Sequence, residues 1–287
     1  MIFDRKWLVL FLAGILTLIS TGTSISLSGG SSAIIEGADS VKGVTTPEGT
    51  DITATGSIQA AVNTAPTGAT ISLLPKTYYE NVQVPKSLSI IGAGQDLTKV
   101  DGSGIGSVFT VGREENQNID VTLSDMTIIN GNADNGGINN AGTLDLKNVL
   151  ITGNTGSGIL NEGTVNMYTG SSIASNIADY AGGGILNEGT VNMYAGSSIA
   201  VNTAGNGGGV LNMGMVNMYT GSFIANNIAD YGGGVLNVGT VTFTDSITGE
   251  RVAYWPGYDT ITDSYGFFTP HNNIGDIIQI QGISIYV

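Results

Sequence analysis

The 287-residue sequence predicts an all-β fold of the single-stranded parallel β-helix type, a three-sided solenoid of stacked coils. The first observation is internal repetition. The phrase GILNEGTVNMY stands at Gly158 and Gly184, and variants of it begin at Gly209 and Gly234, at intervals of 25 or 26 residues. The second is that each repeat contains short runs with apolar residues at alternate positions, such as 164–168, separated by Gly and Asn. This alternation is typical of strands and excludes helical repeats, which need long stretches of period 3.6.

The repeat length selects among the β architectures. A propeller blade needs about 40 residues, and a leucine-rich repeat needs leucines in a fixed frame that this sequence lacks. A repeat of about 22–26 residues suits one coil of a parallel β-helix, in which equivalent residues of successive coils lie about 4.8 Å apart. We expect about eight or nine coils.

Two series of asparagines repeat with the coils and are predicted to form structural ladders. Stacked asparagine amides hydrogen-bond along such an axis, as side-chain ladders do in cross-β stacks. Glycine runs in the same repeats are expected to form tight corners, because glycine tolerates positive φ. The first series is Asn140, Asn161, Asn187, Asn212 and Asn237. The second series is Asn132, Asn154, Asn176, Asn202 and Asn227.

The first 26 residues are predicted to be a secretory signal peptide. Arg5 and Lys6 precede an apolar run at 7–19, which is short for a membrane span, and small residues follow at 20–26. The alternative is an uncleaved N-terminal anchor. Residues 27–54, rich in Ser, Gly and Thr, are predicted to be a lead-in to the solenoid.

Residues 55–245 are predicted to form the β-helix, and residues 246–287 its C-terminal cap. Near the start, Ile58, Ala61 and Val62 fit one face of a short helix, which would cap the exposed β-edges at the N-terminal end. The last 42 residues change character and gain aromatics, as terminal units of solenoids commonly do. Strands ahead of the repeats are expected at 69–74, 81–84, 87–91, 107–111 and 120–129.

Two stretches carry a family resemblance. The order SIQAAV…GATISLLPKTYYENVQVPKSLSIIGAG…KVDG, within residues 57–102, resembles the opening coils of the pectin-lyase-like right-handed β-helix superfamily. The pattern IASNIADYAGGGILNEG, from Ile173, is similar to the repeats of polymorphic outer-membrane-protein type surface β-helices. The resemblance implies a right-handed coil and an exported or cell-surface protein. It does not by itself imply an enzyme, because one fold hosts many functions.

Charge and cysteine content narrow the setting. The formal net charge of −14 repels nucleic acid and anionic lipid, so we expect no nucleic-acid partner and no membrane contact beyond the signal peptide or anchor. No cysteine is present, so an exported fold would be held by stacking of its coils rather than by disulfides. The expected location is secreted or at the cell surface, and the expected partner is a surface glycan or an envelope protein.

The repeats contain little material for catalysis. Lyases and esterases of the superfamily that the chain resembles pair acidic residues with an arginine or lysine, and its glycosidases use clustered aspartates. Residues 148–250 contain no Lys, Arg or His. The sole histidine, His271, lies in the predicted cap, where we expect a structural role. No catalytic residue is therefore assigned.

Two pairs of carboxylates recur in the repeats. Asp179 and Asp230 occupy equivalent turns two coils apart, and Glu162 lies one coil from Glu188. We interpret both pairs as solvated turn residues, with a catalytic pair as the alternative. The Asp- and Asn-rich turns offer the oxygen ligands that Ca²⁺ takes, but no EF-hand or nonapeptide motif is present, so no metal or cofactor is expected.

One outward surface is expected to be regular. If Val165 and Met167 point inward, then Asn166 and Tyr168 point outward, and the same holds in the following coils. Rows of tyrosine suit sugar rings or a partner protein, because they combine apolar faces with a polar tip. The alternative is that the stacked rings stabilise neighbouring coils. The predicted binding residues are Tyr168, Tyr194 and Tyr219 with Asn166, Asn192 and Asn217.

Three functional hypotheses follow from these features. The first is a non-catalytic secreted or cell-surface β-helix with a structural or adhesive role. The second is a carbohydrate-active lyase, esterase or hydrolase of the pectin-lyase-like class, and the third is a glycan-binding module without catalysis. Near-identical repeats favour the first hypothesis, because a catalytic coil would interrupt the repetition with a distinctive charged cluster.

Overall fold

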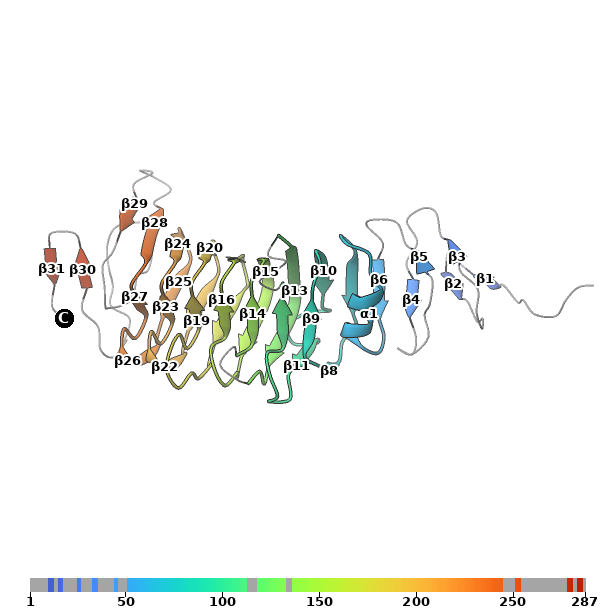
Figure 1. Ribbon diagram of the computed structural model, residues 1–287, viewed down its shortest axis with the longest axis horizontal. Helices are drawn as coiled ribbons and strands as arrows, with labels where there is room; N and C mark the ends of the chain where they lie inside the picture. The colour runs from blue at the N-terminus through green and yellow to red at the C-terminus, as the bar shows by residue number, and fades with distance from the viewer. Residues whose placement is uncertain are drawn as a thin grey trace, which may run out of the picture.

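The computed structural model describes residues 51–112, 118–132 and 136–244. This part of the chain is a parallel β-solenoid with one short helix, α1 (Ile58–Thr64), and Figure 1 shows its coils stacked one after another. The predicted signal peptide, most of the lead-in, and the C-terminal cap with His271 lie outside the described residues. Short strands are also defined outside these ranges: β1 (Leu10–Leu12), β2 (Ile15–Thr17), β3 (Ile25–Ser26), β4 (Ala33–Ile35), β5 (Val44–Thr45), β29 (Arg251–Ala253), β30 (Ile278–Ile280) and β31 (Ile283–Ile285).

The strands make three sides of the solenoid, and equivalent strands of successive coils pair in parallel. The first side contains β6 (Asp51–Ala54), β7 (Thr70–Leu73), β10 (Leu88–Ile91), β13 (Asp120–Ile129), β15 (Thr143–Thr152), β17 (Thr164–Met167), β20 (Thr190–Met193), β24 (Met215–Tyr219) and β28 (Thr240–Thr244). The second side contains β8 (Thr77–Tyr79), β11 (Lys99–Asp101), β18 (Ser172–Ala174), β21 (Ser198–Ala200) and β25 (Phe223–Ala225). The third side contains β9 (Val82–Val84), β12 (Phe109–Val111), β14 (Ile138–Asn140), β16 (Ile159–Asn161), β19 (Ile185–Asn187), β23 (Val210–Asn212) and β27 (Val235–Asn237).

The first two sides belong to one sheet because β13 and β15 bend from one side into the other. The bend lies at Asp125 and Asn148, whose φ angles are 54° and 53°, and the pairing of the two strands skips these two residues. A further pair, β22 (Thr203–Asn206) with β26 (Ile228–Tyr231), lies at a corner of the later coils. Strand β6 pairs with β7, so the sheet already includes the last four residues of the predicted lead-in.

The prediction of a parallel β-solenoid is confirmed, but the expected number of coils was too high. The third side has seven strands, so about six full turns separate β9 from β27 in the described residues. The early coils use more chain than the repeats do. For example, Leu88 of β10 pairs with Val121 of β13, and this coil is 33 residues long by the contact between Ser87 and Asp120.

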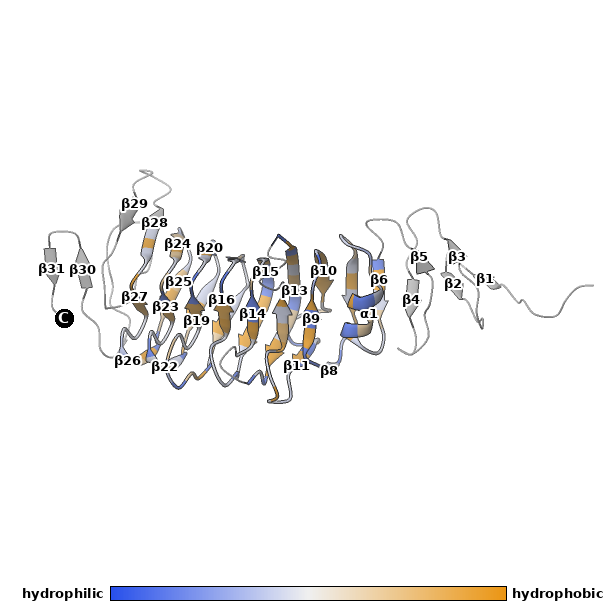
Figure 2. Ribbon diagram, in the orientation of Figure 1, coloured by the Kyte–Doolittle hydropathy of each residue, from blue (hydrophilic) through white to orange (hydrophobic). Residues whose placement is uncertain are grey.

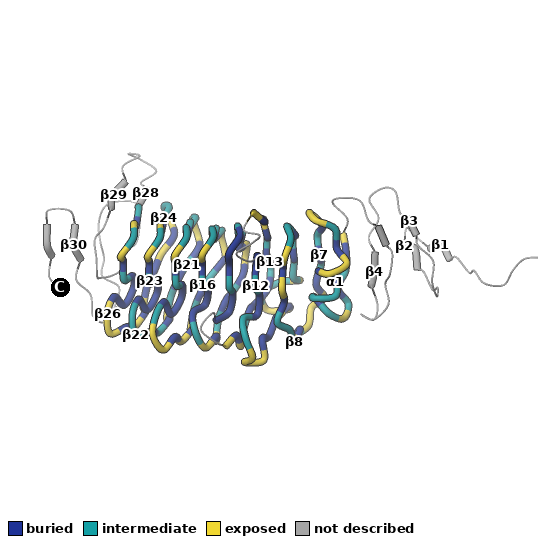
Figure 3. The backbone as a smooth tube through the Cα atoms, in the orientation of Figure 1, coloured by how far each residue is buried: buried dark blue, intermediate teal, exposed yellow. Residues whose placement is uncertain are grey.

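The core is a set of apolar files that run through the coils. Strands of the repeats alternate buried and partly exposed residues, so Val165 and Met167 point inward as predicted. Figure 2 shows hydrophobic residues along the strands, and Figure 3 shows exposed residues gathered at the turns. Each file buries its members against the coils on both sides, which stabilises by roughly 1.5–3 kcal/mol per large side chain. The repeat files are Val165, Val191, Val216 and Val241; Met167, Met193 and Met218; Ile159, Ile185, Val210 and Val235; and Ile173, Ile199 and Ile224.

Helix α1 covers the free edge of the third side, which confirms the predicted cap. Ile58, Ala61 and Val62 are its buried residues. The carboxamide of Gln59 accepts a hydrogen bond from the backbone N–H of Gln83 in β9 at 2.7 Å and donates to its carbonyl at 3.1 Å. It therefore replaces the missing neighbour strand at an edge that would otherwise be open to pairing. The Glu80 carboxylate accepts from the first N–H groups of the helix at 2.8 and 2.9 Å.

The first asparagine series forms a buried ladder at the ends of the third-side strands. Each Nδ2 donates to the Oδ1 of the next coil, at 2.8 Å from Asn140 to Asn161 and at 2.7 Å in the following steps. The same amide also donates to two backbone carbonyls, as Asn161 does to Gly163 and Thr190. Every member is buried, so these bonds satisfy amides that water does not reach.

The second series forms a similar ladder, but its first member was assigned one residue too late. Asn154, Asn176, Asn202 and Asn227 are buried, and each Nδ2 donates to the next Oδ1 at 2.8 to 3.0 Å. In the preceding coil the N–H of Gly131 donates to Asn154 Oδ1, so Gly131 occupies the ladder position. Asn132 is exposed and donates to the carbonyl of Gly104.

The residue before each member of the second ladder has positive φ. Asn130, Gly153, Ser175 and Asn226 adopt this conformation at φ between 55° and 62°, and Val201 adopts it at 60°. The predicted glycine corners behave alike at Gly182, Gly207 and Gly232. A β-branched residue is the least suited to this region, and the left-handed conformation costs roughly 1–2 kcal/mol in an L-residue.

We expect Val201→Asn to raise the free energy of unfolding by about 1 kcal/mol, because asparagine tolerates the left-handed region better than valine. The Val201 side chain is 55% exposed, so the change removes little packing. Thermal unfolding of the two proteins measures the effect. Ser175→Asn, at the equivalent position of the previous coil, is the control and should change stability less. A lower melting temperature for Val201→Asn would contradict the prediction.

Candidate functional site

The outward side of β17, β20 and β24 carries two parallel rows of identical residues. The rings of Tyr168 and Tyr194 stack with centroids 4.9 Å apart and an interplanar angle of 12°. The rings of Tyr194 and Tyr219 stack at 4.8 Å and 17°. These spacings equal the distance between neighbouring strands, so the row follows directly from the register of the coils.

Mutual stacking covers the ring faces inside the row. The face of Tyr168 that turns away from Tyr194 lies near Lys147, whose Nζ is 5.3 Å from the ring centroid. Lys147 Nζ also lies 3.6 Å from the carboxylate of Asp145. The row therefore presents ring edges and hydroxyl groups rather than open faces to a partner. This geometry favours a role in stabilising adjacent coils, and a binding role stays a prediction.

The neighbouring row is a chain of amides that ends on a carboxylate. Asn217 Nδ2 donates to Asn192 Oδ1 at 2.8 Å, and Asn192 Nδ2 donates to Asn166 Oδ1 at 2.8 Å. Asn166 Nδ2 then donates to Asp145 Oδ1 at 2.9 Å, a charge-assisted bond at the acceptor end of the chain. At the other end the hydroxyl of Thr242 donates to Asn217 Oδ1. All three asparagines are partly exposed, so the chain forms part of the surface.

The environment of this face perturbs two of its tyrosines. Burial raises the pKa of Tyr168, and the charges of Asp145 and Tyr194 raise it further. Burial also raises the pKa of Tyr194, followed by the effects of Tyr219 and Asp145. In both cases the neutral phenol is favoured, because a phenolate would be poorly solvated and would lie beside other negative groups.

This perturbation predicts a loss of stability in alkali. Because the folded pKa exceeds the unfolded value, the unfolded state ionises first as the pH rises through about 10, and the free energy of unfolding falls. Below the unfolded pKa the contribution is fully present. We expect the Tyr168→Phe/Tyr194→Phe variant to lose less stability than the wild type between about pH 8 and 11. Thermal unfolding across this range tests it, and equal pH slopes for both proteins would contradict it.

The predicted carboxylate pairs lie at the surface. Glu162 and Glu188 are exposed in successive coils, and Met213 takes the equivalent position in the next one. Asp179 and Asp230 are exposed at the corner beside β22 and β26. In the described ranges no group of three or more His, Cys, Asp or Glu side chains is arranged to hold a metal ion.

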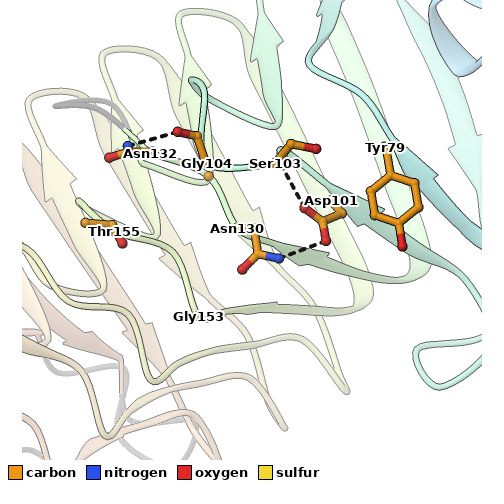
Figure 4. A pocket seen from close by; sticks show the side chains of 9 residues that line it. Tyr79, Asp101, Ser103, Gly104, Asn130, Asn132, Gly153 and Thr155 are labelled. Atoms are coloured by element: carbon orange, nitrogen blue, oxygen red, sulfur yellow. Dashed lines mark hydrogen bonds between the residues drawn. The ribbon is translucent and has the colours of Figure 1, made fainter.

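A groove that the sequence did not indicate lies at the carboxyl ends of β8, β11, β13 and β15 (Figure 4). Its volume is about 430 Å³. Asp101 Oδ1 accepts from the N–H of Ser103 and its Oδ2 accepts from Asn130 Nδ2, both at 2.8 Å. The lining residues are Tyr79, Asp101, Ser103, Gly104, Asn130, Gly131, Asn132, Gly153 and Thr155.

Sequence reasoning missed this groove because its residues lie in coils that precede the near-identical repeats. The usable signal was positional: Tyr79 and Asp101 end parallel strands, and Asn130 and Gly153 each follow the end of one. Register then brings Tyr79 and Asp101 side by side, since they pair directly between β8 and β11.

Comparisons of the chain with models of protein families, with curated proteins and with solved structures gave no significant match. The resemblance to the pectin-lyase-like superfamily and to surface β-helix repeats therefore stays a prediction. Within the described residues, no helix is long and apolar enough to cross a membrane.

Proposed function

We propose that the chain is a non-catalytic, exported or cell-surface β-helix protein with a structural or adhesive role. The observation that carries the proposal is the in-register outward face of β17, β20 and β24. Three tyrosines and three asparagines are each held by an identical residue in the next coil. A face whose side chains are already ordered loses little conformational entropy when it binds a partner.

The composition of the face indicates the kind of partner. Lys147 is the last lysine of the sequence, and residues 148–250 contain no basic side chain at all. The face therefore suits neutral or basic surfaces, such as an envelope protein or an uncharged glycan, and would repel acidic polymers. The ring edges and hydroxyls of the tyrosines and the amides of the asparagines would make the polar contacts of such a complex.

Export is proposed from the N-terminal sequence. The basic pair, the short apolar run and the small residues that follow support cleavage of a signal peptide near residue 26. The absence of cysteine suits a solenoid, whose stability comes from contacts between coils in any redox environment. We further propose that the coil is right-handed and related to the pectin-lyase-like superfamily, on the motifs within residues 57–102.

Binding of the full chain to a glycan array and to a panel of intact cells tests the proposal. We expect binding that falls at least tenfold in a Tyr168→Ser/Tyr194→Ser/Tyr219→Ser variant, because the ordered row is removed. The matched control replaces Tyr180 and Tyr231 with serine, since both are exposed but lie away from this face. Unfolding curves of the variants separate lost binding from lost folding.

Two outcomes would contradict the proposal. Release of reducing sugars, or of unsaturated products that absorb ultraviolet light, from a polysaccharide panel would show catalysis. Binding that survives the triple serine replacement in a folded variant would remove the face of β17, β20 and β24 from the adhesive role.

A further inference from the structure

We propose that the groove at the carboxyl ends of β8, β11, β13 and β15 binds a neutral sugar residue. The groove lies in the earlier coils and shares no residue with the tyrosine row. Its biological use rests on the proposed adhesive function, which it deepens by naming a ligand class. Its ability to bind a sugar depends only on the residues that line it.

The groove is the place where the solenoid stops repeating. Tyr79 pairs with Asp101, which pairs with Ile129 of the next coil. An aromatic ring and a carboxylate thus stand at a file that the later coils fill with small residues. Loss of repetition in a solenoid marks a local requirement, since stacking alone would be served by more of the same residue. The later members of the file are Thr152, Ala174, Ala200 and Ala225.

The lining is rich in hydrogen-bond acceptors. The two Asp101 oxygens each accept one bond from the protein, and a carboxylate has room for about four, so each can accept another. Asn130 uses its Nδ2 to hold Asp101, and its Oδ1 has no donor among the described residues. The hydroxyls of Ser103 and Thr155 face the same groove. Acceptors in this number match a ligand that carries several hydroxyl donors.

Tyr79 supplies an apolar surface beside these polar groups. Its side chain is 71% exposed, whereas Asp101 is 8% exposed at the base of the groove. Figure 4 shows the ring next to the carboxylate. Unlike the rings of the tyrosine row, Tyr79 stacks on no other aromatic ring in the described residues. An open ring beside acceptors fits a pyranose, which has both C–H faces and hydroxyl edges.

Charge and shape restrict the ligand further. The lining contains one charge, that of Asp101, and no basic side chain, so an acidic sugar would meet repulsion without compensation. The volume of about 430 Å³ lies within the range of small-molecule sites. The corner is also preformed, because Ser103 and Asn130 hold positive φ in the same way as Ser175 does in a later coil.

Ligand-observed NMR and calorimetric titration of the full chain test the site with neutral gluco-, manno- and N-acetylglucosamine oligosaccharides and with oligogalacturonate. We expect at least one neutral series to bind and oligogalacturonate to bind more weakly. Tyr79→Ala should lower the affinity about tenfold by removing the ring. Asn130→Gly should lower it as well, while glycine keeps the left-handed backbone that Asn130 adopts.

Tyr180→Ala is the matched control, because Tyr180 is 82% exposed and lies outside the groove. The inference is overturned if no neutral oligosaccharide binds, if oligogalacturonate binds best, or if both groove variants retain wild-type affinity. The serine variants of the tyrosine row should leave this binding unchanged, so failure of the groove and failure of the adhesive face are separate results.

Discussion

An Asn187→Leu variant is expected to lose about 3–4 kcal/mol of unfolding free energy. Asn187 is fully buried, accepts from Asn161 Nδ2 and donates to Asn212 Oδ1, both at 2.7 Å. It also donates to the carbonyl of Met215 at 3.1 Å. Leucine has a similar size but makes none of these bonds. Asn212 Oδ1 would then remain buried with no donor among the described residues, which is the expensive part of the change.

The control for this variant comes from the same coil. Asn192→Leu breaks bonds to Asn166 and Asn217 of the same type and length, but Asn192 is partly exposed. Water replaces the lost partners there, so we expect a loss below about 1 kcal/mol. Urea unfolding followed by circular dichroism compares the two. Similar losses would mean that burial of the inner ladder does not hold the coils together.

Periodicity explains why the ladders could be predicted and where the prediction slipped. Asn161 and Asn187 follow identical strands, so only an in-register stack aligns them, and residue counting is sufficient. Asn132 follows a coil of a different sequence, and counting by period misses the ladder position by one residue. The hydrogen bond from Gly131 to Asn154, which identifies the correct position, depends on the backbone path.

The candidate sites were less accessible for a related reason. Alternation predicts that Tyr168 and Tyr194 point outward, but only the ring orientation decides whether their faces are open or stacked. The groove depends on contacts between coils that share no sequence pattern. Tyr79, Asp101 and Asn130 become neighbours through the pairing of β8, β11 and β13, which a single sequence does not specify.

A file of glycines shows how tightly the coils approach each other. It contains Gly163, Gly189, Gly214 and Gly239, one in each coil, between the third side and the first. A Cβ built on any of them would lie 2.0–2.1 Å from the carbonyl oxygen of a glycine in the preceding coil. None of the four has positive φ. They are therefore required by close contact between backbones and not by their conformation.

Gly189→Ala is accordingly expected to cost roughly 4 kcal/mol or more, because its Cβ would meet the Gly163 oxygen at 2.0 Å and backbone atoms of Glu162 at 2.8 Å. Neither contact belongs to a side chain that could move aside, so the two coils would have to separate. Gly106→Ala is the control, since its Cβ meets nothing within 4 Å and its φ is ordinary. Urea unfolding of both variants measures the difference. A Gly189→Ala protein as stable as the control would show that the coils can shift apart at low cost, and the rigid face inferred for binding would lose its physical basis.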